Sequence, residues 1–107
     1  DGRPSFHISL VRDVSPYCDC HGDNDLPIIP DVGMFASFDP VALDLACADA
    51  ANAQPCIPGS KLDAARKSGV TAEDNLTADF PHTNWRSQIA HGKKLGLGED
   101  SYELIRV

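Results

Sequence analysis

Basic residues are scarce in this chain, and long apolar runs are absent. Nine Lys and Arg stand against sixteen Asp and Glu, which gives a formal net charge of −7. Because nucleic-acid phosphates require clustered Lys and Arg, this balance argues against a nucleic-acid partner and against anionic membrane surfaces. No stretch approaches the ~20 apolar residues that a membrane span needs, and no basic segment followed by an apolar one marks a signal peptide. We therefore expect neither nucleic acid nor membrane among its partners.

Several signatures of catalysis are also missing. The sequence has no Gly-rich phosphate loop of the Walker or dinucleotide type. Neither Ser15 nor Ser37 lies in a nucleophile elbow, and no triad supports a hydrolase or transferase that uses Asp and His. The sequence alone therefore leaves open whether the chain is an enzyme.

The chain also lacks an initiating Met, since it begins at Asp1. Its 107 residues contain no repeat and no linker, so we expect a single domain over residues 1–107. The start at Asp1 suggests an excised fragment or a processed product.

Cysteine is scarce too, but two of the four cysteines stand one residue apart, in Cys18-Asp19-Cys20-His21. Two thiols at this spacing cannot comfortably meet the geometry of a disulfide, although both can point at a third group. A thiolate pair beside an imidazole and carboxylates is typical of a metal or redox site. No secretory signal supports disulfides, so we expect a reducing, cytoplasmic location.

Alternation of apolar and polar residues indicates the strands. Three strands are expected, at residues 6–14, 33–37 and 101–106. In the first, Phe6, Ile8 and Leu10 share one face. The second is predicted to be short and buried. Between these two, the Pro, Gly and acidic residues of 16–33 predict a long structured loop, and such loops are usually functional or mobile.

Capping signals indicate the helices. Three helices are expected, at residues 40–52, 60–67 and 84–95. The first is marked most clearly, since Asp39 suits the N-cap and Pro40 suits the first helical position. Thr83 is the predicted cap of the last helix, and Trp85 is its predicted anchor on the core. Residues 70–83 are expected to be irregular. The predicted fold class is α/β, with a small sheet of about three or four strands and two or three helices.

The Cys-Asp-Cys run belongs to a longer pattern that spans most of the chain. The pattern consists of Ser15-Pro16-Tyr17-Cys18-Asp19-Cys20, residues 27–37 (PIIPDVGMFAS), residues 39–44 (DPVALD), Pro58-Gly59-Ser60, Trp85 with Gln88, residues 95–98 (LGLG) and residues 102–105 (YELI). In these residues the chain resembles the uncharacterised iron–sulfur-centre proteins grouped as domain of unknown function 362. Many members carry ferredoxin-type Cys-x-x-Cys-x-x-Cys runs, which this sequence lacks. The resemblance implies the C-terminal part of a longer protein with an association to redox chemistry.

The thiol pair is the first candidate site. His21 could complete a Cys₂His ligand set with Cys18 and Cys20, and a water or a carboxylate would fill the fourth position. Asp23 and Asp25 are the nearest hard ligands, unless they form a solvated loop surface. Nearby acids would raise the thiol pKa values, whereas a bound cation would stabilise the thiolates. Three roles stay open: ligation of a metal or cluster, thiols without a ligand, and a redox-active pair.

The other two cysteines are weaker candidates. Cys47 lies inside the expected helix 40–52, where core packing is favoured over ligation, and Cys56 lies in a turn beyond it. A single cluster held by all four cysteines stays open. Asp44 and Asp49 lie about 140° apart around a helix, so they do not form a paired-carboxylate site.

Two functions from different classes follow. The first is a redox-associated module of an iron–sulfur-centre protein, in which Cys18, Cys20 and His21 contact an iron–sulfur cluster or a single metal ion and a redox partner exchanges electrons with it. The second is a non-catalytic structural or interaction domain, which packs on a missing N-terminal region of the same protein.

Overall fold

Two strands and four helices make up the regular structure of the described residues, 3–18 and 20–107, in this computed structural model. The elements are β1 (His7–Val11), β2 (Gly33–Ser37), α1 (Pro40–Asn52), α2 (Lys61–Lys67), α3 (Asn75–Asp79) and α4 (Arg86–Lys94). The expected α/β class is confirmed, but the expected numbers of strands and helices are slightly wrong. Within the described part of the chain, no helix is both long and apolar enough to cross a bilayer.

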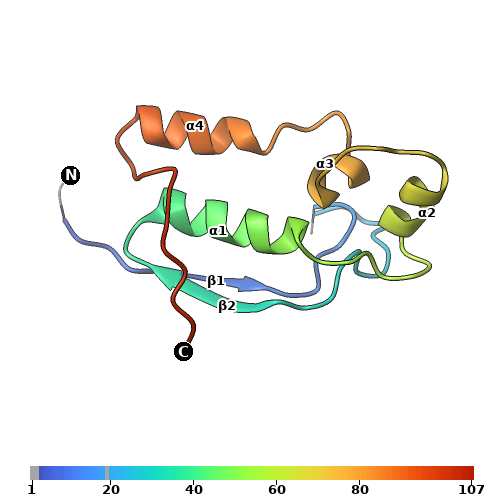
Figure 1. The fold of residues 1–107 in the computed structure, drawn as a ribbon, viewed down its shortest axis with the longest axis horizontal. Helices are drawn as coiled ribbons and strands as arrows, with labels where there is room; N and C mark the ends of the chain where they lie inside the picture. The colour runs from blue at the N-terminus through green and yellow to red at the C-terminus, as the bar shows by residue number, and fades with distance from the viewer. Residues whose placement is uncertain (1–2, 19) are drawn as a thin grey trace.

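Helix α1 lies at the centre of the fold, between the sheet and α4. Strands β1 and β2 pair antiparallel, with His7 opposite Ser37 and Val11 opposite Gly33. Helix α1 contacts both strands on one side and α4 on the other, so sheet, α1 and α4 form successive layers (Figure 1). A helix covered on two sides is apolar over most of its circumference. Its buried residues are Val41, Ala42, Leu43, Ala46 and Ala51.

Asp39 fixes the start of α1, as the sequence predicted, and ties it to the chain beyond α4. Its Oδ1 accepts hydrogen bonds from the backbone N–H of Val41 at 3.0 Å and of Ala42 at 2.9 Å. Its Oδ2 accepts one from the N–H of Glu99 at 2.8 Å. Gly98 permits this approach, because a Cβ there would overlap Oδ1 of Asp39 and lie 2.7 Å from its Cγ.

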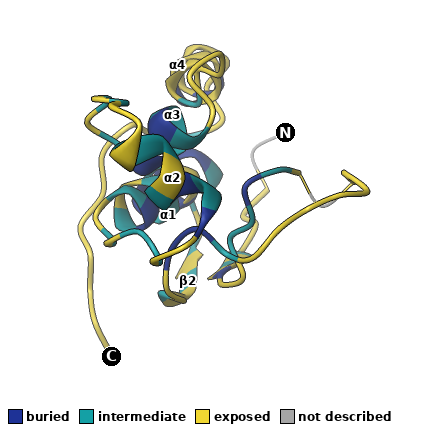
Figure 2. Cartoon of the chain, turned by 90° about the vertical axis from the view of Figure 1, so that its right-hand side faces the viewer, coloured by how far each residue is buried: buried dark blue, intermediate teal, exposed yellow. Residues whose placement is uncertain are grey.

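The most deeply buried side chains lie at the other end of α1, where the β1–β2 loop meets α2 and α3 (Figure 2). Ile28 and Ile29 come from that loop and are each 1% exposed, and Leu62 of α2 is 0% exposed. The N–H of Ile28 donates to the carbonyl of Val14, and its carbonyl accepts from the N–H of Ile57, both at 2.8 Å. The loop is thereby anchored to the core, and the cysteines at its start are held near this end of the molecule.

A buried asparagine closes the C-terminal end of α1. Nδ2 of Asn75 donates to the carbonyl oxygens of Ala51 at 3.0 Å and of Gln54 at 2.7 Å. Asn75 also begins α3, a helix in a stretch that was predicted to be irregular. Asp74 caps this helix by accepting a hydrogen bond from the N–H of Thr77 at 2.7 Å. A local cap and a long-range amide contact therefore overcome the polar composition of this stretch.

The chain after α4 corrects the predicted third strand. Residues 101–106 all lie in the described part of the chain, and they have no regular structure and are exposed. They pass across α1 and the sheet without pairing with either strand (Figure 1). The hydroxyl of Tyr102 donates to Oδ2 of Asp49 at 2.8 Å. A side-chain contact therefore positions this segment in place of the backbone ladder that a strand requires.

The sheet presents its apolar face outward. We call this surface the outer sheet face, and its large residues are Phe6, Ile8, Leu10, Met34 and Phe38, which are 57%, 60%, 63%, 68% and 71% exposed. The register places Leu10 opposite Met34, and the rings of Phe6 and Phe38 lie 5.0 Å apart. The predicted strand at 33–37 is confirmed, but the expectation that it would be buried is wrong. Helix α1 covers the alternate residues instead, and it brings Val11 and Phe35 to the core.

Candidate functional site

Cys18 and Cys20 converge at the surface, in the loop between β1 and β2. Their sulfur atoms lie 3.0 Å apart, with the thiol of Cys20 donating to Sγ of Cys18. Both side chains are exposed, and each of the four cysteines in the described chain is a thiol rather than half of a disulfide. Asp19, which stands between the two, lies outside the described residues. The pair is therefore accessible from solution and is not core filling.

One side chain, that of Asn24, organises the backbone around the thiol pair. Its Oδ1 accepts from the N–H of Tyr17 at 3.1 Å, and its Nδ2 donates to the carbonyls of Tyr17 at 3.0 Å and Cys18 at 3.2 Å. The carbonyl of Cys18 also accepts from the N–H of His21 at 2.9 Å. Sequence analysis assigned Asn24 no role. An Asn in a Gly- and Asp-rich loop is the available signal, because its amide can bridge backbone groups of a turn.

The electrostatics of the pair favour a neutral thiol at Cys20 in the absence of a cation. The hydrogen bond to Cys18, and then the charge that Cys18 carries when ionised, raise the pKa of Cys20 above its ordinary value. A nucleophilic cysteine needs a lowered thiol pKa, because the thiolate is the reactive form. A bound cation would reverse the balance by stabilising the thiolates directly.

His21 has other neighbours than the thiols. Its Nδ1 lies 3.0 Å from Oδ1 of Asp23, and its ring stacks on Tyr17 with the centroids 4.4 Å apart. Among residues 3–18 and 20–107, no three or more His, Cys, Asp or Glu side chains are grouped so that they could hold a metal ion. The described residues therefore supply two sulfurs together and not a complete coordination shell.

The remaining cysteines lie against the core, as expected for Cys47. Burial raises the pKa of the Cys47 thiol above its ordinary value. Cys56 is half-buried, and its Sγ lies 3.9 Å from Oδ1 of Asp63. Both thiols pack against the core cluster, so the structure does not bring the four cysteines together.

A pocket of about 460 Å³ opens beside the thiol pair, and we call it the loop pocket. One wall comes from the β1–β2 loop, with Ser15, Pro16, Tyr17, Cys18, His21 and Ile28. The opposite wall comes from α3 and the segment that follows it, with Leu76, Asp79, Phe80, Thr83 and Trp85. Its size and its mixture of apolar walls with a few polar groups are typical of small-molecule sites.

Lys61 of α2 lies at the edge of the loop pocket. Its Nζ is 3.8 Å from the ring centroid of Tyr17 and 5.0 Å from that of Phe80. These two rings meet edge to face, with their centroids 5.7 Å apart. The cation–π contacts hold the two walls of the pocket together at this point.

Trp85 and Thr83 do not have the roles that the sequence suggested. Helix α4 begins at Arg86, directly after Trp85, and no side chain caps it. The hydroxyl of Thr83 donates instead to the carbonyl of Phe80 at 2.7 Å. Trp85 is half-buried and lines the loop pocket. Sequence analysis also missed Asp79, because nothing in the local pattern shows that this acid faces a loop some sixty residues earlier in the chain.

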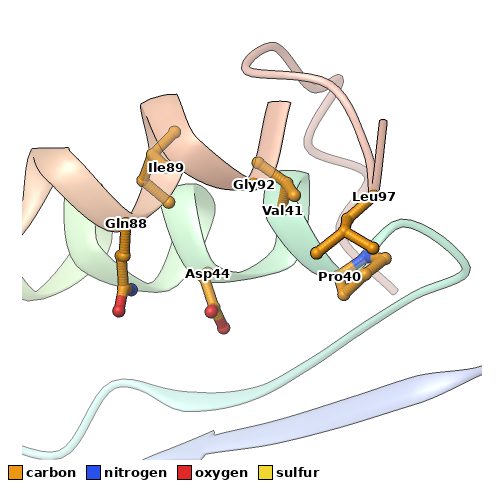
Figure 3. Close-up of a pocket in the computed structure, with 7 residues that line it drawn as sticks. All are labelled: Pro40, Val41, Asp44, Gln88, Ile89, Gly92 and Leu97. Atoms are coloured by element: carbon orange, nitrogen blue, oxygen red, sulfur yellow. The ribbon is translucent and has the colours of Figure 1, made fainter. Parts of the chain in front are cut away.

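A second, smaller hollow lies between α1 and α4 (Figure 3). It has a volume of about 160 Å³. Gly92 makes the close helix contact possible, since a Cβ there would lie 2.9 Å from Cγ2 of Val41. Asp44 and Gln88 project to the same side in Figure 3, and both are exposed. The hollow is smaller than ordinary ligand sites, so we treat it as a packing feature of the two helices.

Comparison with known proteins relates part of the chain to a family. Residues 3–49 match the family model "Domain of unknown function (DUF362)". The match supports a domain of this family over β1, the β1–β2 loop, β2 and most of α1. The resemblance noted in the sequence is thus confirmed for this segment. No curated protein and no solved structure matches the chain.

Proposed function

We propose that this chain is a redox-associated module that contributes Cys18 and Cys20 as thiolate ligands to an iron–sulfur centre or a single metal ion. The observation that carries this function is the convergence of two exposed sulfurs, 3.0 Å apart, in a loop held by Asn24. The proposal also includes a reducing, cytoplasmic location and a redox partner.

The sulfur positions fit half of a metal site. Metal–thiolate bonds of about 2.3 Å in a tetrahedral shell place two sulfurs roughly 3.8 Å apart. Exposed side chains reach that separation by small χ rotations, because no core packing holds them. His21 stays the predicted third ligand, and it would have to leave Tyr17 and Asp23 to serve as one. Otherwise the remaining ligands come from cluster sulfide or from another polypeptide.

An iron–sulfur centre bound here would supply one-electron transfer, which the side chains alone do not. The chain's own contribution is positional. Asn24 holds the carbonyls of Tyr17 and Cys18, and the N–H of His21 closes the turn, so both sulfurs project to solvent where a metal and a partner protein can reach them.

The test is anaerobic reconstitution with iron and sulfide, followed by elemental analysis and an absorption spectrum. We expect bound metal with a thiolate charge-transfer band. The variant with Cys18→Ser and Cys20→Ser should lose both, and the matched variant with Cys47→Ala and Cys56→Ala should keep both. Protein without metal or chromophore, or equal metal content in the two variants, would contradict the function.

A second candidate is favoured by the outer sheet face. A Phe side chain carries about 150–250 Å² and Ile, Leu and Met somewhat less, so the five residues together expose on the order of 500 Å². This is near the upper end for the largest patch of a monomer. Both strands of the patch lie within the segment that matches the family. As a second function we propose an interaction domain, whose outer sheet face packs on the N-terminal region of a longer protein.

Dye binding tests this second candidate on the chain as it stands. We expect the hydrophobic dye ANS to bind, and Leu10→Ser to weaken its fluorescence. Leu95→Ser is the matched control, since Leu95 is nearly as exposed as Leu10, at 60% against 63%, but lies after α4 and away from the sheet. An absence of dye binding by the unmodified chain would rule out this candidate.

A further inference from the structure

The two sulfurs of the thiol pair lie close enough to react with each other. The distance between Sγ of Cys18 and Sγ of Cys20 is 3.0 Å. A disulfide bond is about 2.05 Å long, so the sulfurs would have to approach by about 1 Å to form one. The one-residue spacing disfavours a relaxed disulfide, yet the folded loop holds the two sulfurs within this short reach.

The loop fixes the backbone of the pair and leaves its side chains at the surface. Asn24 holds the carbonyl of Cys18 at 3.2 Å, and the N–H of His21 donates to the same carbonyl at 2.9 Å. The side chains of Cys18 and Cys20 are both exposed, so the close packing that restricts rotation in a protein core does not surround them. A small change of χ angle can therefore bring the sulfurs together while the turn stays in place.

The loop pocket gives a small substrate access to Cys18. This residue is exposed and also lines the pocket, whose volume is about 460 Å³. Ile28, Leu76 and Phe80 supply apolar wall, which suits a molecule with short carbon arms. A thiolate attacks a disulfide at one sulfur while the other sulfur leaves, so the attacking residue needs free space beside it. The pocket provides that space next to Cys18.

The other two cysteines have different surroundings. Cys47 and Cys56 are half-buried, and both pack against the core cluster. Access controls the rate of thiol–disulfide exchange, so these thiols should react more slowly than the exposed pair. They provide a comparison within the same chain.

We propose that the Cys18–Cys20 pair exchanges reversibly with small-molecule disulfides and passes between a dithiol and an intramolecular disulfide. The thiolate of Cys18 attacks one sulfur of the substrate, which forms a mixed disulfide on Cys18 and releases one thiol. Cys20 then loses its proton to solvent and attacks Sγ of Cys18, which forms the Cys18–Cys20 bond and releases the second thiol. The protein dithiol is oxidised by two electrons, and the substrate disulfide is reduced to two thiols.

The short spacing makes the protein disulfide easy to reduce again. With one residue between the cysteines, the bond cannot comfortably adopt the preferred Cβ–S–S–Cβ angle of about 85–100°. Strained and exposed disulfides are the labile ones, which serve catalysis or regulation. The disulfide offers no thiolates to a metal, so exchange would switch the ligand pair off. That regulatory effect rests on the proposed function, whereas the exchange itself needs no metal.

The test uses metal-free chain with Cys47→Ala and Cys56→Ala, in which the pair supplies the remaining thiols. The probe is an excess of 2-hydroxyethyl disulfide, and intact mass is the readout. We expect the protein to lose the mass of two hydrogen atoms and to regain it with millimolar glutathione. Adding Cys20→Ser removes the second thiol, so the mixed disulfide on Cys18 should accumulate at least about tenfold more than with Cys20 present.

The unmodified chain gives the same answer by peptide mapping, so the test stands even if a variant fails to fold. The Cys18–Cys20 disulfide should appear there before any modification of Cys47 or Cys56. No reaction of the pair, stable mixed disulfides on both cysteines, or a disulfide that survives millimolar glutathione would each overturn the proposal. A pair that exchanges but binds no metal would contradict only the function proposed above. A pair that binds metal but does not exchange would overturn only this inference.

Discussion

The contact between Gly98 and Asp39 makes the replacement of one small residue a sharp test of the fold. In Gly98→Ala, the new Cβ would overlap Oδ1 of Asp39, lie 2.7 Å from its Cγ and lie 3.0 Å from Cβ of Val41. The carboxylate therefore cannot keep its hydrogen bonds to the start of α1 and to Glu99 at once.

The expected cost combines two effects. Losing an N-cap costs about 0.5–2 kcal/mol, and forcing an extra methyl group into a packed site costs about 1–3 kcal/mol. We expect Gly98→Ala to lower the free energy of unfolding by about 2–4 kcal/mol, a large share of the roughly 5–15 kcal/mol that small domains possess. Urea unfolding followed by circular dichroism and Trp85 fluorescence measures this difference.

A double-mutant cycle separates the overlap from other effects. Gly22→Ala is the matched control, since a Cβ at Gly22 meets nothing within 4 Å, and it should change stability by less than about 0.5 kcal/mol. Adding Asp39→Ala to Gly98→Ala removes the overlapping carboxylate, so the two costs should sum to more than the cost of the double variant. A Gly98→Ala protein as stable as Gly22→Ala would refute the contact.

Two further predictions concern the ends of α1. Asn75→Ala removes the donor to the carbonyls of Ala51 and Gln54, and the unpaired buried groups should lower the free energy of unfolding in urea by about 1–3 kcal/mol. Asn84 is exposed, so Asn84→Ala should lower it by less than about 0.5 kcal/mol. Equal losses in the two variants would contradict the role of Asn75 in closing the end of α1. At the other end, desolvation raises the pKa of Asp39, but the backbone N–H groups that it accepts from outweigh this and lower the pKa below its ordinary 3.8. A lowered pKa stabilises the folded state above pH 3.8, and this contribution is lost as the pH falls through the folded-state pKa. The free energy of unfolding, measured from about pH 6 to about pH 2, should therefore fall more steeply with acid for the unmodified chain than for Asp39→Asn. Parallel curves would show that the cap is not charged.

Local signals in the sequence predicted some elements well. The pair Asp39-Pro40 marks the start of α1, and the helix ends at Asn52 as predicted, because an N-cap and a first-turn proline act within a few residues. The alternation of Phe6, Ile8 and Leu10 predicted a strand, because this pattern is also a property of residues close together in the sequence.

The elements that depend on distant residues were not predictable in the same way. Alternation places apolar residues on one face, but it does not say which face α1 covers, and the structure leaves Ile8 and Leu10 exposed. Residues 101–106 have a strand-like pattern, yet a strand forms only beside a partner, and the segment does not pair with β1 or β2.

In the candidate site, too, local features could be predicted from the sequence and features that depend on distant residues could not. The Cys18–Cys20 pair could be predicted from the sequence because only one residue separates the two cysteines. The loop pocket is not, because Asp79 and Trp85 reach it only when α3 packs beside the β1–β2 loop. The bridging contacts of Asn24 depend on one exact loop conformation, which composition does not specify.

The most direct test of the thiol pair as a ligand pair is X-ray absorption at the zinc edge of protein loaded anaerobically with one equivalent of zinc. We expect two sulfur ligands at about 2.3 Å, completed by nitrogen or oxygen, and we expect the sulfur shell to vanish in Cys18→Ser with Cys20→Ser but to persist in Cys47→Ala with Cys56→Ala. A shell of nitrogen and oxygen alone, or a sulfur shell that survives the loss of Cys18 and Cys20, would contradict the proposed function.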